Sequence, residues 1–218
     1  MSVGRRVALV AVALAAVALV ATPAVQAKAK RVMKQAVKTF CTDTSVRIPD
    51  GPEFGDYVSE SASTGKTCPK GIVCGYGGLP LGAVVLDVEA GIRVSHPSAG
   101  DLSVLLVSPV GTLATLTGQG NGGGGDDFGA GGTGCDAAFT SFDDQAAVPI
   151  RGATAAQAPF AGAFRPHLPL AANVGTFGAG DWRFFFDDTV PGNVGVVEAV
   201  SLRLSYKYVV RKKKKRKS

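Results

Sequence analysis

The chain has 218 residues, of which 46% are hydrophobic and 18% are charged, and its formal net charge is +6. This composition excludes a disordered chain, and the 29 glycines favour turns and loops over long helices. All 17 acidic residues lie in residues 39–210, together with only nine of the 23 basic residues. The body is therefore acidic between two basic ends, which argues against a specific nucleic-acid-binding face.

The first 27 residues show the three parts of a secretory signal peptide. Arg5 and Arg6 precede an apolar run over residues 7–21, and Val25 and Ala27 are the small residues of a cleavage site. The alternative is a retained membrane anchor, but a spanning helix needs roughly 20 apolar residues, more than this run supplies. We therefore expect cleavage after Ala27, secretion to the extracellular space, and no transmembrane segment in the mature chain.

The mature chain has the size of one domain. Residues 28–38 carry five basic side chains and are expected to form a short helix or a flexible basic arm. Residues 39–208 are expected to hold the folded domain, and residues 209–218 a basic C-terminal tail. In that tail the segment from Arg211 to Lys217 is either solvated or in contact with an anionic cell surface.

Four cysteines follow the signal peptide, and in an exported chain this number favours two disulfides. Three pairings are open. We favour Cys68 with Cys74, which closes a short loop, and Cys41 with Cys135, which closes a long one. Zinc is not indicated, because the chain has no C-x₂-C pair and neither histidine lies near a cysteine pair.

From residue 84 onward, apolar and polar residues alternate as they do in half-buried strands. In residues 84–94, this pattern puts Leu86, Val88, Ile92 and Val94 on one face. Residues 102–107 are apolar on both faces and predict a central strand. A turn then leads to a hairpin partner at residues 112–117.

Further along the chain, a glycine-rich loop at residues 118–134 has too little apolar surface to order itself. A short strand is expected at residues 148–150, an aromatic strand at 182–186, a loop at 187–193 and a closing strand at 197–209. No segment after residue 38 has helical periodicity. The pattern as a whole predicts an all-β fold, an antiparallel sandwich or barrel.

Several motifs, in this order, resemble the P domain (P/Homo B domain), the module beside the subtilisin-like catalytic domain of proprotein convertases. They cover about residues 39–206. They include residues 92–96, 100–112, 127–128, 142–146, 159–166, 180–182 and 187–189. The resemblance implies a jelly-roll β-sandwich of the galactose-binding-like kind. Two segments depart from the family pattern: residues 61–80 are longer, and residues 167–180 lack its acidic and asparagine-rich character.

Calcium is the metal that the acidic loops and the resemblance point to, since some P domains bind it. The expected ligands come from three pairs of neighbouring acidic residues and are Asp127, Asp143, Asp144, Asp187 and Asp188. Like charges placed together are costly without a cation, and extracellular calcium fills even weak sites. The alternative is that these acidic loops are simply solvated.

No catalytic residues are assigned. The mature chain has two histidines, His96 and His167, and no nucleophile motif of a serine hydrolase. His96 lies at a strand end and is expected to be a hydrogen-bonded structural residue. Family membership would nevertheless associate the chain with serine endopeptidase activity and proteolysis.

Three functions follow from these observations. The first is a secreted non-catalytic module that stabilises or binds an exported protease or another extracellular protein. The second is a glycan-binding or cell-surface-binding sandwich, for which Trp182 would have to be exposed. The third is a peptidase in its own right, with His96 as the base.

Overall fold

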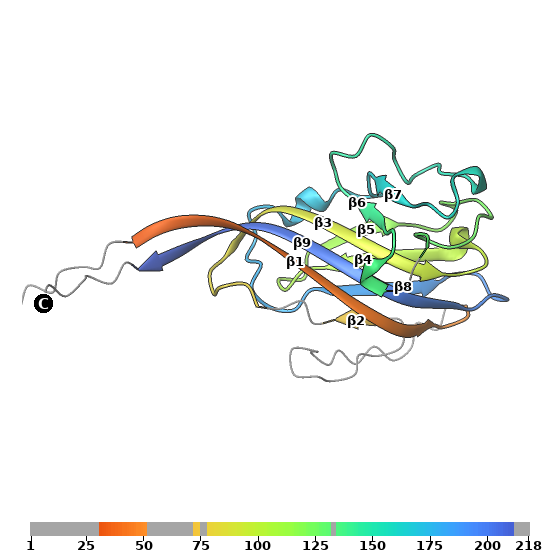
Figure 1. The fold of residues 1–218 in the computed structure, drawn as a ribbon, viewed down its shortest axis with the longest axis horizontal. Helices are drawn as coiled ribbons and strands as arrows, with labels where there is room; N and C mark the ends of the chain where they lie inside the picture. Colours follow the sequence, from red (N-terminus) through yellow and green to blue (C-terminus); the bar gives the residue numbers. More distant parts are fainter. Residues whose placement is uncertain (1–30, 52–71, 75–77, 132–133, 212–218) are drawn as a thin grey trace, which may run out of the picture.

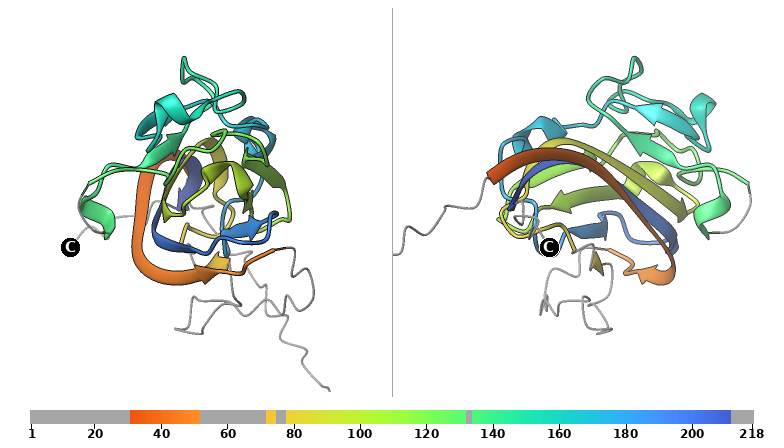
Figure 2. Two further views of the ribbon diagram at one scale, coloured as in Figure 1. Left: turned by 90° about the vertical axis from the view of Figure 1, so that its right-hand side faces the viewer. Right: turned by 60° about the vertical axis from the view of Figure 1, so that its left-hand side comes forward.

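The fold was taken from a computed structural model, which describes residues 31–51, 72–74, 78–131 and 134–211. These residues form a β-sandwich of two facing sheets (Figures 1 and 2). No helix in the described part of the chain is long and apolar enough to cross a membrane. The strands are β1 (Arg31–Ile48), β2 (Ile72–Cys74), β3 (Val84–Ser95), β4 (Leu102–Val107), β5 (Leu113–Thr117), β6 (Thr140–Phe142), β7 (Gly162–Phe164), β8 (Arg183–Asp188) and β9 (Gly195–Arg211).

One sheet has the strand order β1-β9-β3-β6-β7 and the other has β2-β8-β4-β5. Neighbouring strands are antiparallel except for β6 and β7, which are parallel. The chain changes sheet on either side of β2, between β3 and β4, between β5 and β6, and on either side of β8. Neither sheet closes on itself, so the predicted all-β sandwich is confirmed and the barrel alternative is not.

The core lies between the sheets and consists of alternate side chains of the long strands. β4 buries Leu102, Val104 and Leu106, with its other side chains half-buried. It is hydrogen-bonded to β8 on one side and β5 on the other, as expected of a central strand. Each such side chain contributes about 1.5–3 kcal/mol on burial. Phe184, Phe186 and Trp182 supply the bulk on the β8 side.

The inward face predicted for residues 84–94, which belong to β3, is wrong at one position. Val85 is buried and Leu86 is only half-buried, because the pairing of β3 with β9 shifts register between Val85 and Asp87. A bulge of this kind turns every residue before it to the opposite face. From Val88 onward the predicted alternation holds.

The basic arm expected at residues 28–38 takes a different form in the described residues. Residues 31–38 are neither a helix nor an unpaired arm but the first half of β1. They pair with the end of β9, from Arg31 opposite Arg211 to Lys38 opposite Leu204. The two strands together run out beyond the sandwich body (Figure 1), so paired structure crosses the boundaries placed at residues 39 and 208.

Two smaller expectations also need correction. Asp187 and Asp188 end β8 and are not in a loop; the loop begins after them. Residues 148–150 contribute a single bridge, Pro149 to Arg165, and not a strand. Ile150 is nevertheless fully buried, so its apolar character serves the core.

Candidate functional site

A buried histidine–aspartate pair lies at the end of the sandwich where β3 and β8 finish. His96 follows β3 directly, and Asp188 is the last residue of β8. Their side chains are essentially inaccessible to solvent, and Nε2 of His96 lies 3.1 Å from Oδ2 of Asp188. They are 92 positions apart in the chain, so only the meeting of the two sheets brings them together.

The hydrogen bonds fix the protonation of His96. The backbone N–H of Ser98 donates to Nδ1 at 3.1 Å, so Nδ1 carries a lone pair. The ring proton is then on Nε2, which donates it to the Asp188 carboxylate. Both ring nitrogens are therefore satisfied inside the protein with the imidazole neutral, which agrees with the structural role predicted for His96.

Further hydrogen bonds at this end of the sandwich join four chain segments. Asp127 accepts the backbone N–H of His96 at 2.8 Å, and its own N–H donates to the His96 carbonyl. Asp188 also accepts the N–H of Val190 at 3.1 Å. The carbonyl of Asp101 accepts both the N–H and the hydroxyl of Thr189, at 2.9 and 2.7 Å. We call this set, His96, Asp101, Asp127, Asp188 and Thr189, the histidine cluster.

Asp187 precedes Asp188 in β8, so its side chain faces the opposite side of the strand, where it is half-buried. Its pKa is raised above the ordinary value of 3.8, first because burial disfavours the carboxylate and second because the Asp188 charge is adjacent.

The other two predicted calcium ligands have separate hydrogen-bonding roles. Asp143 accepts the N–H of Gln145 at 2.8 Å. Both carboxylate oxygens of Asp144 accept backbone N–H groups at the start of the short helix η5 (Leu170–Asn173), from Leu170 at 2.9 Å and Ala171 at 2.7 Å. These bonds hold a loop in place, as a cap does.

The described side chains do not by themselves form a calcium cage. In the described ranges, the only group of three or more potential metal-ligating side chains is Cys41, Asp43 and Cys135. Both of its sulfurs are consumed by a disulfide, so this group does not fit a metal either. The five predicted aspartates are therefore not brought to one point, and calcium binding stays a prediction.

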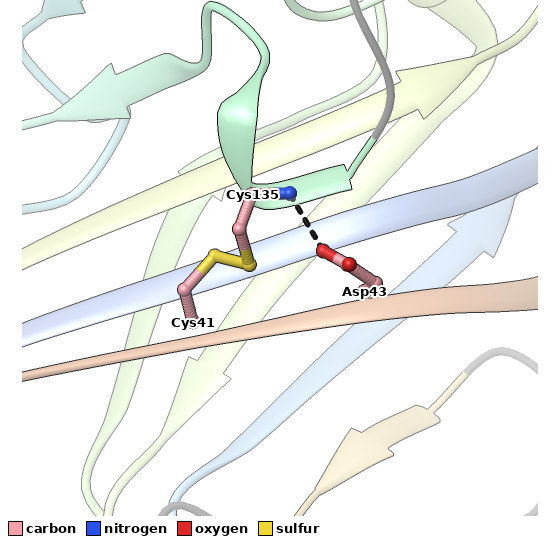
Figure 3. The surroundings of a disulfide bond; sticks show 3 residues. All are labelled: Cys41, Asp43 and Cys135. Carbon is pink, nitrogen blue, oxygen red and sulfur yellow. Dashed lines mark hydrogen bonds between the residues drawn. A yellow bond between two sulfur atoms is a disulfide. The ribbon is translucent and has the colours of Figure 1, made fainter.

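The disulfide joins Cys41 of β1 to Cys135 of the short helix η3 (Gly134–Asp136), as predicted (Figure 3). Asp43 reinforces this link, since its carboxylate accepts the N–H of Cys135 at 2.6 Å. Gly134 has φ of +59°, and a Cβ there would overlap the Asp43 carboxylate, so glycine is required at this position. The other predicted pair falls on Cys68 and the Cys74 side chain, which lie outside the described residues.

An open depression of about 270 Å³ lies beside this link and is lined by Asp43, Thr44, Gly134 and Glu198. Glu198 is not free in it, because one of its carboxylate oxygens lies 2.7 Å from Nε of Arg93. With Asp43 committed to Cys135 as well, both acidic groups already have partners.

The glycine-rich loop is ordered by a means that the sequence did not reveal. Besides the disulfide, it is held by backbone hydrogen bonds, among them Gly122 to Ala153 and Phe128 to Val94 in both directions. Phe128 is fully buried and packs against Phe160, with ring centroids 5.4 Å apart. Phe128, the large apolar side chain of the loop, thus anchors it.

His167 has a role that sequence reasoning missed. Nδ2 of Asn121, in the glycine-rich loop, lies 3.2 Å from Nδ1 of His167. The backbone N–H of His167 also donates to the carbonyl of Leu116 in β5. It therefore fixes the start of the loop against β5, and no local pattern around residue 167 signals this.

Comparison with known proteins found distant structural similarity. No family model matches the chain, and no curated protein matches it. A crystal structure of a serine protease of Aeromonas sobria is 16% identical with a TM-score of 0.44, over 80% of this chain and 27% of that one. A structure of the same protease in complex with a chaperone is 14% identical with a TM-score of 0.42, over 84% and 28%. This chain thus spans about a quarter of the length of the solved chains it resembles.

Proposed function

We propose that this chain is an exported, non-catalytic β-sandwich module that binds and stabilises an exported protease or another extracellular protein. Support comes from the P-domain-like motifs, which follow one another in the family's order, and from the positions of these motifs in the fold. Four of them supply the histidine cluster: His96 ends the first, Asp101 lies in the second, Asp127 begins the third, and Asp188 and Thr189 lie in the last. A shared set of motif residues that ties loops together is what a structural module requires.

The observation that carries the non-catalytic part of the proposal is the state of His96. It is 1% exposed, and both of its ring nitrogens are bonded to protein groups. A general base must reach the proton that it abstracts, and a neutral imidazole whose proton already faces a carboxylate on one side and whose lone pair is occupied on the other cannot do so. The peptidase alternative therefore has no base in His96.

The glycan-binding alternative depended on an exposed Trp182. This side chain is fully buried, and its Nε1–H donates to the carbonyl of Gly178 at 3.1 Å. Stacking of a sugar ring needs an accessible aromatic face, so Trp182 does not support this function.

Affinity capture tests the proposal. The bait is the exported, processed chain, incubated in calcium with the other exported proteins of the source. A second bait ends at Arg211, which keeps β9 intact and removes the rest of the basic tail. We expect both baits to retain a protein partner, with peptidase activity in the eluate above that of an unrelated sandwich, while the bait alone is inactive.

Two results would count against the proposal. If the purified bait alone cleaves peptides and His96→Ala abolishes that activity in a protein that still folds, the chain is an enzyme. If neither bait retains any protein above the unrelated control, the binding function fails.

A further inference from the structure

The outer halves of β1 and β9, residues 31–38 and 204–211, pair with each other in a ribbon whose outer end projects from the sandwich body (Figure 1). The pairing of β3 with β9 ends at Lys207. Within the described residues, the last four residues of β9 are thus paired with β1 alone. This end of the ribbon, which we call the ribbon tip, comprises residues 31–34 and 208–211.

The two faces of the ribbon differ. On the face turned toward the core, Ala36, Phe40 and Tyr208 pack against core side chains, and Tyr206 and Tyr208 stack with centroids 5.6 Å apart. The other face is solvent-facing and carries apolar residues that no other described part of the chain covers. They are Met33, Val37 and Val209, which are 60%, 53% and 51% exposed.

The register places two of these three residues together. Met33 is directly opposite Val209, and both lie on the same face because opposed residues of an antiparallel pair share a face. Val32 and Val210, the next pair outward, take the other face and are half-buried. The ribbon tip is therefore apolar on both faces, over two successive cross-strand pairs.

Cations surround this apolar tip. Arg31 and Arg211 form the outermost pair, both exposed, and Lys34 is exposed as well. Neither segment of the ribbon contains an aspartate or a glutamate. Lys38 is used within the fold, since its Nζ donates to the Gly78 carbonyl and lies 4.7 Å from the Phe40 ring centroid. Arg31, Lys34 and Arg211 thus lie beside the apolar pairs of the ribbon tip.

We infer that the ribbon tip is a docking element for an anionic lipid bilayer, with Met33 and Val209 entering the headgroup region and Arg31, Lys34 and Arg211 contacting lipid phosphates. Apolar side chains beside lysine and arginine, without acidic residues, have the chemistry of interfacial membrane binding. A soluble polyanion would use the cations but leave the apolar pairs without a role. Edge-to-edge pairing of β1 with a second copy would oppose like charges, as lysines on edge strands do.

The test is binding of the processed, exported chain to vesicles, with its N-terminus verified by mass spectrometry so that the apolar segment of residues 7–21 is absent. Vesicles of phosphatidylglycerol mixed with phosphatidylcholine are compared with vesicles of phosphatidylcholine alone by co-sedimentation. We expect binding only to the anionic vesicles, weakened by added salt. The basic tail stays intact in every variant, so its contribution is constant.

Two sets of variants separate the ribbon from the tail. Met33→Ser with Val209→Ser is expected to weaken vesicle binding about fivefold or more, because apolar contact with the interface is lost. Arg31→Gln is expected to weaken it about fivefold. The matched control is Val194→Ser, an exposed valine (43%) just before the opposite end of β9, which should leave binding unchanged.

Three outcomes would overturn the inference. Unchanged binding in the Met33→Ser, Val209→Ser protein would mean that the tail alone holds the bilayer. Equal binding to both kinds of vesicle would remove the role of charge. Concentration-dependent self-association that these serine substitutions abolish, with no effect on vesicle binding, would assign the ribbon to a second copy of the chain instead. A melting curve on each variant, expected to match the parent because the sites are exposed, excludes unfolding as the cause.

Discussion

At the scale of single residues, the buried His96 and Asp188 side chains of the histidine cluster are both fully engaged in hydrogen bonds. Neutral His96 takes a hydrogen bond from Ser98 at one nitrogen and gives one to Asp188 at the other. The Asp188 charge is thereby stabilised by two donors, His96 and the N–H of Val190. Buried polar groups are stabilising only when such bonds are made, and removing one partner costs more than the bond itself contributed.

His96→Ala is therefore expected to lower the free energy of unfolding by about 2–4 kcal/mol, since it leaves the Asp188 carboxylate with one donor fewer and opens a cavity. Urea denaturation measures this. The control is His167→Ala, whose side chain is only half-buried and whose loss should cost less. A loss below about 0.5 kcal/mol for His96→Ala would show that the cluster is not stabilising.

Asp187 gives the pH prediction at this scale. Its folded-state pKa lies above the 3.8 of an ordinary aspartate, so between those two values the folded state binds more protons than the unfolded state. Stability therefore falls as the pH rises through that window. Above it, the folded chain carries the cost of a partly buried charge beside Asp188.

Asp187→Asn is accordingly expected to raise the melting temperature slightly at neutral pH in the presence of chelator, by about 1 °C because solvent screens much of the effect. The difference from the parent should vanish at acidic pH, below the ordinary aspartate pKa. A stabilisation that persists unchanged into acid, or a destabilisation at neutral pH in chelator, would contradict this assignment.

At the scale of elements, the disulfide and the glycine-rich loop depend on each other. The link spans 94 positions, with Cα atoms 6.0 Å apart, and fastens η3 to the edge strand β1. On the other side of the loop, Phe128 and its backbone bonds to Val94 attach it to β3. The loop is thus fixed at two points, covalently by the disulfide at its end and by the packing of Phe128. These two points account for the order of a segment that is mostly glycine.

Cys41→Ser with Cys135→Ser is expected to lower the free energy of unfolding by about 3–5 kcal/mol, because a long closed loop restricts the unfolded chain most. Denaturation without reductant measures it. Cys68→Ser with Cys74→Ser is the comparison, since those cysteines would close a much shorter loop and should cost less. An equal or smaller loss for the long-loop pair would count against the entropic account.

At the scale of the whole molecule, the charge distribution separates two regions. The acidic residues all lie outside the ribbon, and every charged residue of the ribbon, residues 31–38 and 204–211, is basic. Because the body and the ribbon are separate regions, the body can bind a protein partner while the ribbon contacts a lipid bilayer. The proposed function and the membrane inference are therefore compatible.

Calcium is tested at this scale, because a bound ion would stabilise the whole cooperative unit by mass action. We expect the melting temperature to be higher in millimolar calcium than in chelator, and magnesium to substitute poorly because it demands stricter octahedral geometry. Identical melting curves in calcium and chelator would rule out a native site of useful affinity.

The sequence by itself predicted the long strands β3 and β9, because a half-buried strand must alternate apolar and polar side chains, and it predicted β4 because that segment is apolar on both faces. It also favoured the Cys41–Cys135 link. It did not predict the short strands β6 and β7. Only the tertiary structure decided what meets across the fold. The pairing of His96 with Asp188, the anchoring of the glycine-rich loop by Phe128 and the bulge that turned Leu86 outward all arise from contacts between distant segments. The ribbon is the clearest case: a row of basic residues has no strand signal of its own, and residues 31–38 become a strand because β9 offers them a hydrogen-bonding edge.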